Sequence, residues 1–92
     1  MDDFLGFVVL SLSGRDKNRL FVVIKQISQD YVLYADGKIR TVDNPKKKKV
    51  KHLKKLGMSS VLDISAVTNK QLRDVLKENK TNADAVNVLK EE

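Results

Sequence analysis

A run of lysines near the middle of the chain is its most distinctive chemical feature. Seven of the eleven residues from Pro45 to Lys55 are lysine, and none of the eleven is acidic. Each lysine carries a hydrated positive charge with three donor hydrogens, which suits phosphate oxygens but cannot by itself read a base. The run therefore predicts contact with phosphates. The alternative is a charged loop that only faces water.

The distribution of charge along the chain favours a polyanion as partner. The 92 residues carry a net charge of +6. Residues 1–44 hold six basic and six acidic groups, residues 45–57 hold seven lysines and no acid, and residues 58–92 hold five basic and six acidic groups. The whole positive excess therefore lies in one segment, whereas charge that serves only solubility would be spread evenly.

A second group of cations lies in the segment GRDKNRLFVVI. Gly14 permits a positive φ, and Arg15, Lys17 and Arg19 precede the apolar residues. We expect a loop that projects two or three cations from one end of a small β-structure, where the lysine run can join it. An ordinary polar turn is the alternative that these residues leave open.

Three other side chains are candidates for a binding role. His52 is the only histidine and has no partner residues at metal-site spacing, so we expect it to be structural or close to phosphate. Tyr31 and Tyr34 can stack on unpaired bases. Because they are three residues apart in an expected strand, they point to opposite faces, and at most one of them faces a ligand. The other belongs to the core.

The sequence lacks the residue sets that are typical of catalysis. It has no cysteine, which excludes disulfides and thiolate metal sites. No carboxylate pair, Ser/His/Asp set or glycine-rich phosphate loop is found, and Asp36 and Asp43 are typical turn residues. We therefore expect no enzyme, no cofactor and no small-molecule substrate.

The apolar segments are too short for a membrane protein. The run from Leu20 to Ile24 cannot span a bilayer, and the first residues, MDDFLG, are acidic where a signal peptide is basic. We expect a cytoplasmic protein without a membrane partner.

The first half of the chain has the pattern of a small β-structure. Apolar, β-forming runs lie at residues 7–12, 19–27 and 31–35. Asp36-Gly37 is typical of a tight hairpin turn, which predicts a fourth strand over residues 38–42. Four short strands with tight connections are expected to curl into a small barrel.

The lysine run follows the fourth predicted strand. Pro45 is expected to end that strand, because proline cannot donate to a sheet. The run then forms a loop or an exposed edge, from which Val50 and Leu53 can dock as a short fifth strand. The three phenylalanines are assigned to the core: Phe4, Phe7 and Phe21.

The second half of the chain changes to helical spacing. Leu72, Val75 and Leu76 fall on one face of a helix, and Thr68 with Gln71 forms a capping-box pattern at its start. We therefore predict a short helix that begins next to Thr68.

These patterns divide the chain into three parts. Residues 1–56 form the barrel and include the basic segment 45–55, residues 57–67 form a connector that is mostly loop, and residues 68–92 form a helical extension. A partly similar pattern over 81–90 predicts a second short helix. We interpret that likeness as shared helix-start chemistry rather than as a true repeat.

Three sequence motifs, taken together, resemble those of the KOW-domain RNA-binding proteins. They are GxVVxSxxGRDKxRxFVV from Gly6, DYVLxADGKxR from Asp30 and PKKKKxKHL from Pro45, and they span roughly residues 5–55. These proteins are kin of large-subunit ribosomal proteins of archaea and eukaryotes, and also occur as small free-standing bacterial proteins. One departure is Asn18, where the family often has a second glycine; asparagine is the next-best residue at positive φ, so the turn can survive.

The resemblance implies a mainly β fold, namely a small SH3-like barrel of the KOW type, here with a C-terminal helical extension of one or two short helices. It also implies RNA binding, with ribosomal RNA or the ribosome as partner and the GRDK loop and basic segment near the RNA. With the charge pattern, it gives the candidate RNA-binding residues Arg15, Lys17, Arg19, Lys38, Arg40, Lys46, Lys47, Lys48, Lys49, Lys51, His52, Lys54 and Lys55.

Several alternatives stay open at this point. The chain can be a protein-interaction adaptor built on the small β-barrel, because small barrels also bind peptides and the C-terminal helices can dock a partner. An uncovered stripe of Leu72, Val75 and Leu76 would support this interpretation. Charge alone does not separate RNA from DNA. PKKKKVK also has the composition of a nuclear import signal, and a lysine run can bind anionic membranes, although this one contains no aromatic residue.

Overall fold

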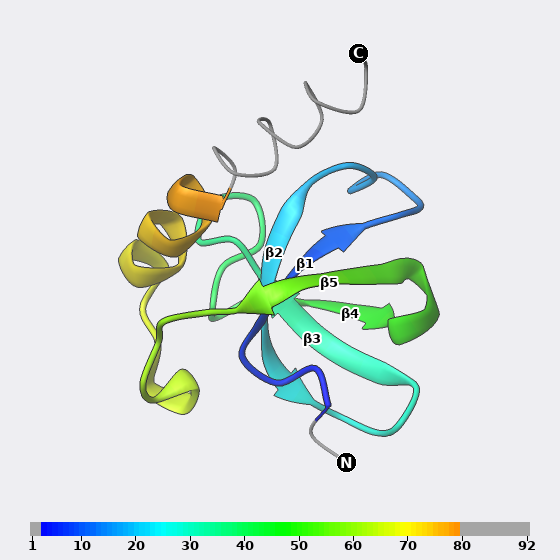
Figure 1. The fold of residues 1–92 in the computed structure, drawn as a ribbon, viewed down its shortest axis with the longest axis horizontal. Helices are drawn as coiled ribbons and strands as arrows, with labels where there is room; N and C mark the ends of the chain where they lie inside the picture. Colours follow the sequence, from blue (N-terminus) through cyan, green and yellow to red (C-terminus); the bar gives the residue numbers. More distant parts are fainter. Residues whose placement is uncertain (1–2, 80–92) are drawn as a thin grey trace.

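Five strands form one antiparallel sheet in the computed structural model, which describes residues 3–79 (Figure 1). The strand order is β4-β3-β2-β1-β5. The two edge strands of this sheet, β4 and β5, are joined by the short 3₁₀-helix η1 (Val50–His52) alone, so the sheet curls enough to bring the end of β4 close to the start of β5. The strands are β1 Phe7–Ser11, β2 Leu20–Gln26, β3 Tyr31–Ala35, β4 Lys46–Lys49 and β5 Leu53–Met58. The prediction of a mainly β, barrel-like fold with a C-terminal helix is therefore confirmed.

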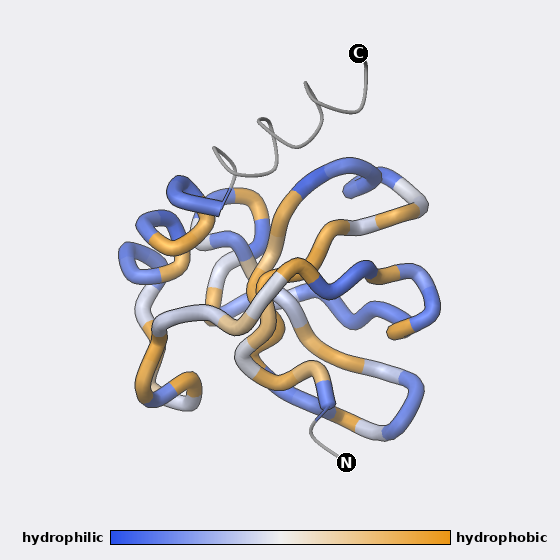
Figure 2. The backbone as a smooth tube through the Cα atoms, viewed as in Figure 1, coloured by the Kyte–Doolittle hydropathy of each residue, from blue (hydrophilic) through white to orange (hydrophobic). Residues whose placement is uncertain are grey.

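The central strands are buried on both faces. On the inside of the curled sheet, Val9, Phe21 and Tyr34 belong to one core cluster, against which Phe4, Phe7 and Val50 are partly buried. On the opposite face, Val8 and Val22 belong to a second cluster. Burial on both faces explains why β2 reads as a continuous apolar run rather than as an alternation. In Figure 2 hydrophobic segments meet at the centre, and the loops around them are largely hydrophilic, with some hydrophobic stretches.

An α-helix over residues 69–79 covers the second face of the sheet. The Thr68 backbone N–H donates to Gln71 Oε1 at 2.9 Å and the Gln71 N–H donates to Thr68 Oγ1 at 3.2 Å, so the predicted capping box is confirmed. Leu72, Val75 and Leu76 pack against Val8 and Val22, with exposures of 0%, 8% and 8%. The apolar stripe is therefore part of the core. The predicted second helix, over 81–90, lies outside the described residues.

The loop between β3 and β4 holds the start of this helix. Gly37 has φ +80°, and a Cβ atom at this position would collide with the backbone carbonyl of Asn69. Asn69 Oδ1 accepts from the Val42 N–H at 2.9 Å, and Arg73 Nη1 donates to the Gly37 carbonyl at 2.9 Å. A glycine in this loop thus permits the close approach of the helix.

The predicted fourth strand, over residues 38–42, is wrong. Asp36 Oδ1 accepts from the backbone N–H groups of Lys38 and Arg40, each at 2.9 Å, and the Arg40 carbonyl accepts from the N–H groups of Asp36 and Gly37. These bonds close the segment into a compact loop, because the aspartate side chain captures N–H groups that a hairpin would need. A second turn over 41–44 follows, and only then does the chain return to the sheet.

The lysine run itself forms the returning strand. β4 begins directly after Pro45, so this proline precedes a strand instead of ending one. Proline is tolerated next to the start of a strand on a sheet edge. A fifth strand does include Leu53, but β5 begins only there and extends to Met58, into the predicted connector. Val50 lies in η1 rather than in a strand, and a second 3₁₀-helix, η2 (Ile64–Ala66), interrupts the connector.

Candidate nucleic-acid interface

The lysines of β4 alternate between the two sides of the edge strand. In the register with β3, Lys46 lies opposite Tyr34 and Lys48 lies opposite Val32. Tyr34 and Val32 are fully buried, so these two lysines belong to the side of the strand that faces the barrel interior. Lys46 is exposed and Lys48 half-buried, so their side chains reach the rim of the barrel.

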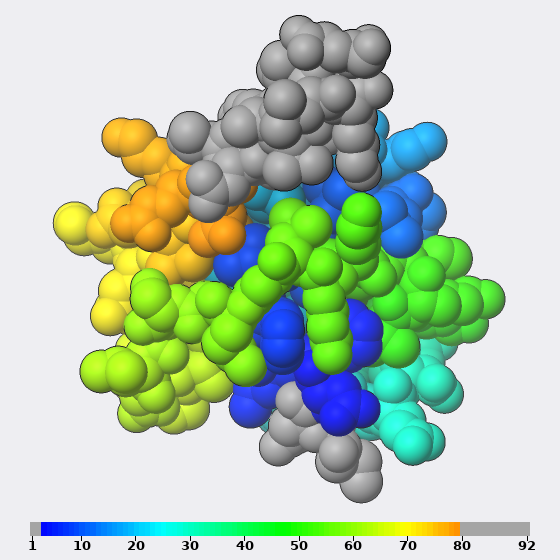
Figure 3. Space-filling view, in the orientation of Figure 1, coloured from blue at the N-terminus to red at the C-terminus, as the bar shows by residue number. Residues whose placement is uncertain are grey.

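Lys48 connects the lysine strand to the GRDK loop. Its Nζ atom donates to the Ser13 carbonyl at 2.9 Å. A Cβ atom on Gly14 would lie 3.3 Å from the same Nζ, so the glycine leaves room for the ammonium group. Figure 3 shows the lysine-rich segment, in green, beside the 12–19 loop, in blue. Two charge groups that are far apart in the sequence thus form one basic region, which we call the loop surface: Arg15, Lys17, Arg19, Lys46 and Lys48.

Backbone hydrogen bonds shape the GRDK loop. The Lys17 N–H donates to the Gly14 carbonyl at 3.2 Å, and the Asn18 N–H donates to the Ser11 carbonyl at 2.8 Å. Gly14 has φ +78° and Asn18 has φ +69°, as expected for both residues. The tight loop directs the side chains of Arg15, Lys17 and Arg19 to solvent, and among residues 3–79 no carboxylate pairs with any of the three.

Asp16 is the one buried residue of this loop, and it fixes the loop to the barrel. Its Oδ2 atom accepts from the Tyr34 hydroxyl at 2.8 Å and from Arg40 Nε at 3.3 Å. Burial alone raises the pKa of the Asp16 carboxyl, but the hydrogen bonds from Tyr34 and Arg40 and the charges of Arg40 and Lys46 outweigh it, and the pKa is lowered. Burial, and then the bond to Asp16, raise the pKa of Tyr34. Tyr34 also stacks on Phe21, with ring centroids 3.9 Å apart.

Asp16 was not identified from the sequence as a structural anchor of the loop. A single acidic residue among the basic residues of this loop could have indicated that role. Its position also changes the role of Arg40, which was predicted to contact RNA. The Arg40 guanidinium is paired with a carboxylate and its side chain is only 26% exposed. Arg40 is therefore less available to a phosphate than the exposed cations of the loop surface.

Lys47 and Lys49 lie on the outer side of β4. They are opposite Leu33 and Tyr31 in the register with β3. Lys47 Nζ lies 4.7 Å and Lys49 Nζ 5.8 Å from the centroid of the Tyr31 ring. Tyr31 is half-buried and Tyr34 fully buried, so the prediction that the two rings point to opposite faces, with one in the core, is confirmed.

The remaining candidate residues lie outside the loop surface and outside the outer side of β4. Lys51 and His52 are in η1, where the His52 carbonyl accepts from the Leu12 N–H at 2.8 Å. Lys54 and Lys55 are exposed on β5, and Lys55 Nζ lies 4.6 Å from the ring centroids of both Phe4 and Phe7. Lys38 is exposed in the loop that contacts the helix.

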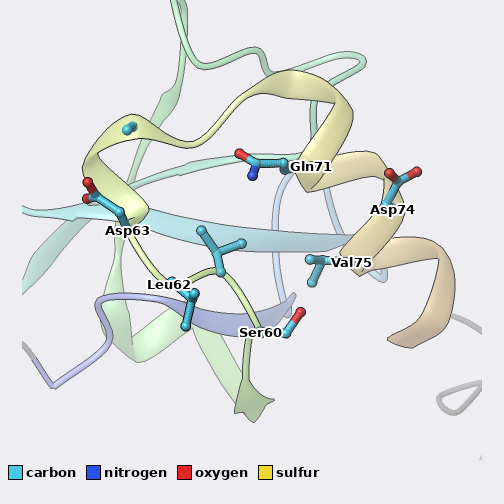
Figure 4. A pocket seen from close by; sticks show the side chains of 8 residues that line it. Ser60, Leu62, Asp63, Gln71, Asp74 and Val75 are labelled. Carbon is cyan, nitrogen blue, oxygen red and sulfur yellow. The ribbon is translucent and has the colours of Figure 1, made fainter.

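A separate cleft of about 480 Å³ lies between the 60–66 segment and the helix (Figure 4). Its charged lining residues are Asp63 and Asp74, so it is acidic rather than basic. Asp63 accepts from the N–H and hydroxyl of Ser65, and Asp74 accepts from Lys70. In the described part of the chain no three His, Cys, Asp or Glu side chains are grouped as a metal site.

Comparison with protein-family models finds no match for this chain, and comparison with curated proteins finds none either. The likeness to KOW-domain proteins therefore stays an interpretation of the quoted motifs. Across residues 3–79, no helix has the length and apolar character that crossing a membrane requires.

Proposed function

We propose that the protein is a cytoplasmic RNA-binding protein without catalytic activity, which contacts structured RNA through backbone phosphates. The loop surface and the lysine strand supply the contacts. The observation that carries this proposal is the bond from Lys48 Nζ to the Ser13 carbonyl, because it joins the lysine strand and the GRDK loop into one basic region. Ribosomal RNA or the ribosome is the partner that the motif resemblance favours.

The charges of this region suit phosphates better than they suit a folded protein partner. Arg15, Lys17 and Arg19 are exposed, as are Lys46, Lys47 and Lys49, and exposed cations exchange counterions for phosphates at little structural cost. If about six phosphates are neutralised, log K falls with log salt with a slope of about −4 on a single strand.

The adaptor interpretation loses its main support in this fold. An uncovered stripe of Leu72, Val75 and Leu76 would have supported it, and these residues are buried against the sheet. The preference for RNA over DNA rests on the resemblance to KOW-domain proteins and not on the lysines, so the test has to include both nucleic acids.

The test is a salt series of binding to a structured ribosomal RNA fragment, with duplex DNA as competitor. Lys46→Gln with Lys48→Gln removes two charges from the loop side of β4, and Lys47→Gln with Lys49→Gln removes two from the outer side. The outer pair should flatten the log–log slope by about 1.4 to 1.8, because each lost phosphate contact contributes about 0.7 to 0.9, and the loop-side pair should flatten it by at least about 0.7 to 0.9 through Lys46.

A matched control removes two charges from the helix, by Lys70→Gln with Lys77→Gln. This control has the same net charge as the strand variants and should keep the wild-type slope. Equal slopes in all three double variants would mean that only net charge matters, and equal competition by DNA would remove the RNA preference. Either result would contradict the proposal.

A further inference from the structure

The outer face of β2, β3 and β4 places an aromatic and an aliphatic side chain among three lysines. Lys25 on β2 pairs with Leu33, which pairs with Lys47 on β4, and Tyr31 pairs with Lys49. Paired residues of antiparallel strands project to the same side of the sheet, as do Tyr31 and Leu33, two residues apart. We call these five residues the outer platform.

Tyr31 is the aromatic side chain of the platform that a ligand can reach. Tyr34, the other tyrosine, has no exposed area and its hydroxyl is bonded to Asp16. The Tyr31 ring is half-buried, and the nearest ammonium groups lie 4.7 Å and 5.8 Å from its centroid. An aromatic ring with cations beside it is the arrangement with which many proteins hold a base together with its phosphates.

We infer that the outer platform binds an unpaired base of single-stranded RNA. The base stacks on the Tyr31 ring, while Lys47 and Lys49 contact the phosphates on either side of it. Leu33 lies next to Tyr31 on the same face and offers apolar contact to the neighbouring nucleotide. This inference rests on the proposed function and adds to it a preference for unpaired segments of the RNA.

The lysines do not block this use of the ring. Lys47 and Lys49 are exposed residues of an edge strand, where a cation–π contact is weak and the lysine side chain is flexible. The ammonium groups can therefore move from the ring to a phosphate when a base arrives. Paired bases of a duplex hide their faces in the helical stack, so the platform discriminates against duplex RNA.

The test compares a short oligoadenosine strand with a blunt-ended RNA duplex of the same length. Tyr31→Leu removes the stacking surface but keeps an apolar side chain, and Tyr31→Phe is the matched control that keeps the ring. We expect Tyr31→Leu to bind the single strand about 5- to 100-fold more weakly than the wild type, as for the loss of one stacked base. Tyr31→Phe should bind both probes like the wild type, and duplex binding should be unchanged in both variants.

A fluorescent variant gives a second measurement, independent of affinity. The chain has no tryptophan, so Tyr31→Trp introduces a single reporter at the platform. Its emission should be quenched by the single strand and not by the duplex. Circular dichroism checks that each variant is folded.

The outcomes separate this inference from the proposed function. If the wild type binds RNA but Tyr31→Leu binds the single strand equally tightly, or the tryptophan emission does not change, the platform is not a base site and phosphate binding stands. If the wild type binds neither probe, both the proposed function and the platform are wrong.

Discussion

The hydrogen bond between Tyr34 and Asp16 is expected to contribute more to stability than any ion pair on the described surface. The Tyr34 ring is fully buried and the Asp16 side chain is 7% exposed. The bond of 2.8 Å has a charged acceptor, and such bonds contribute about 1.5–3 kcal/mol to folding. Tyr34→Phe should therefore lower the free energy of unfolding by about 1.5–3 kcal/mol.

Asp16→Ala is expected to cost more, because it removes the acceptor and leaves buried partners behind. The Tyr34 hydroxyl loses its acceptor inside the barrel, which costs about 1–3 kcal/mol. Arg40 loses its ion pair as well, but its side chain is 26% exposed, so that loss adds at most about 1 kcal/mol. We expect a total of about 1–4 kcal/mol.

Urea unfolding of the two single variants and the double variant measures the coupling between Tyr34 and Asp16. The coupling energy should be about 1.5–3 kcal/mol, and each kcal/mol should shift Tm by about 4–8 °C in a domain of this size. Tyr31→Phe changes a tyrosine outside the core in the same way and serves as the control. A Tyr34→Phe variant within about 0.5 kcal/mol of the wild type, with additive effects in the double variant, would refute this reasoning.

Two further predictions concern pH and the loop that holds the helix. Asp16 has a lowered pKa in the folded protein, so it stabilises the fold above its unfolded pKa of 3.8, and this stabilisation is lost as pH falls through the folded pKa. Tyr34 has a raised pKa, so it stabilises the fold below its unfolded pKa of 10.0, and this stabilisation is lost as pH rises above that value. Urea unfolding across pH should show both declines, and Tyr34→Phe should weaken the alkaline one; an unchanged alkaline decline would contradict this. Gly37→Ala places a Cβ at a residue with positive φ and against Asn69, so it should lower the free energy of unfolding by about 2–4 kcal/mol in the same assay. Gly57→Ala is the control and should be nearly neutral, because the space around its Cβ is open. Equal effects of the two substitutions would contradict the packing argument.

Local signals in the sequence were sufficient for much of the fold. The apolar runs of β1, β2 and β3 were placed to within about one residue, and the capping box of Thr68 and Gln71 marked the start of the helix. In each case the pattern that predicts the element lies within a few neighbouring residues, so the prediction does not depend on tertiary contacts. Burial on both faces of the central strands was not predicted, because it depends on where the helix packs.

The fourth strand was predicted at residues 38–42 instead of in the lysine run, for which an exposed edge was one of two alternatives, because the pairing of β4 is not local. Asp36-Gly37 is a strong hairpin signal, but the Asp36 side chain accepts from two backbone N–H groups and turns the segment into a loop. Four consecutive lysines have low intrinsic preference for a strand. They form one because β3 offers a hydrogen-bonding edge and because Pro45 and the 41–44 turn direct the chain to it.

The charges of the candidate site could be predicted from the sequence, but their grouping could not. Arg15, Lys17 and Arg19 are exposed as expected. The link from Lys48 to Ser13, and the pairing that makes Arg40 less available, depend on contacts between segments more than twenty residues apart. Sequence spacing can show which residues share a strand face, and so it separated Tyr31 from Tyr34, but it cannot show which strands are neighbours.

Edge protection alone does not account for a strand made entirely of lysine. Charged residues on an edge strand prevent pairing with other chains, and natural proteins also do this with short edge strands, proline or bulges. β4 carries a lysine at every position on both of its sides, although neighbouring like charges repel and lower stability. The two sides also make different contacts, since Lys48 reaches the GRDK loop while Lys47 and Lys49 approach the Tyr31 ring. A phosphate backbone that passes along β4 would relieve this repulsion from both sides, which favours a ligand as the reason for the run.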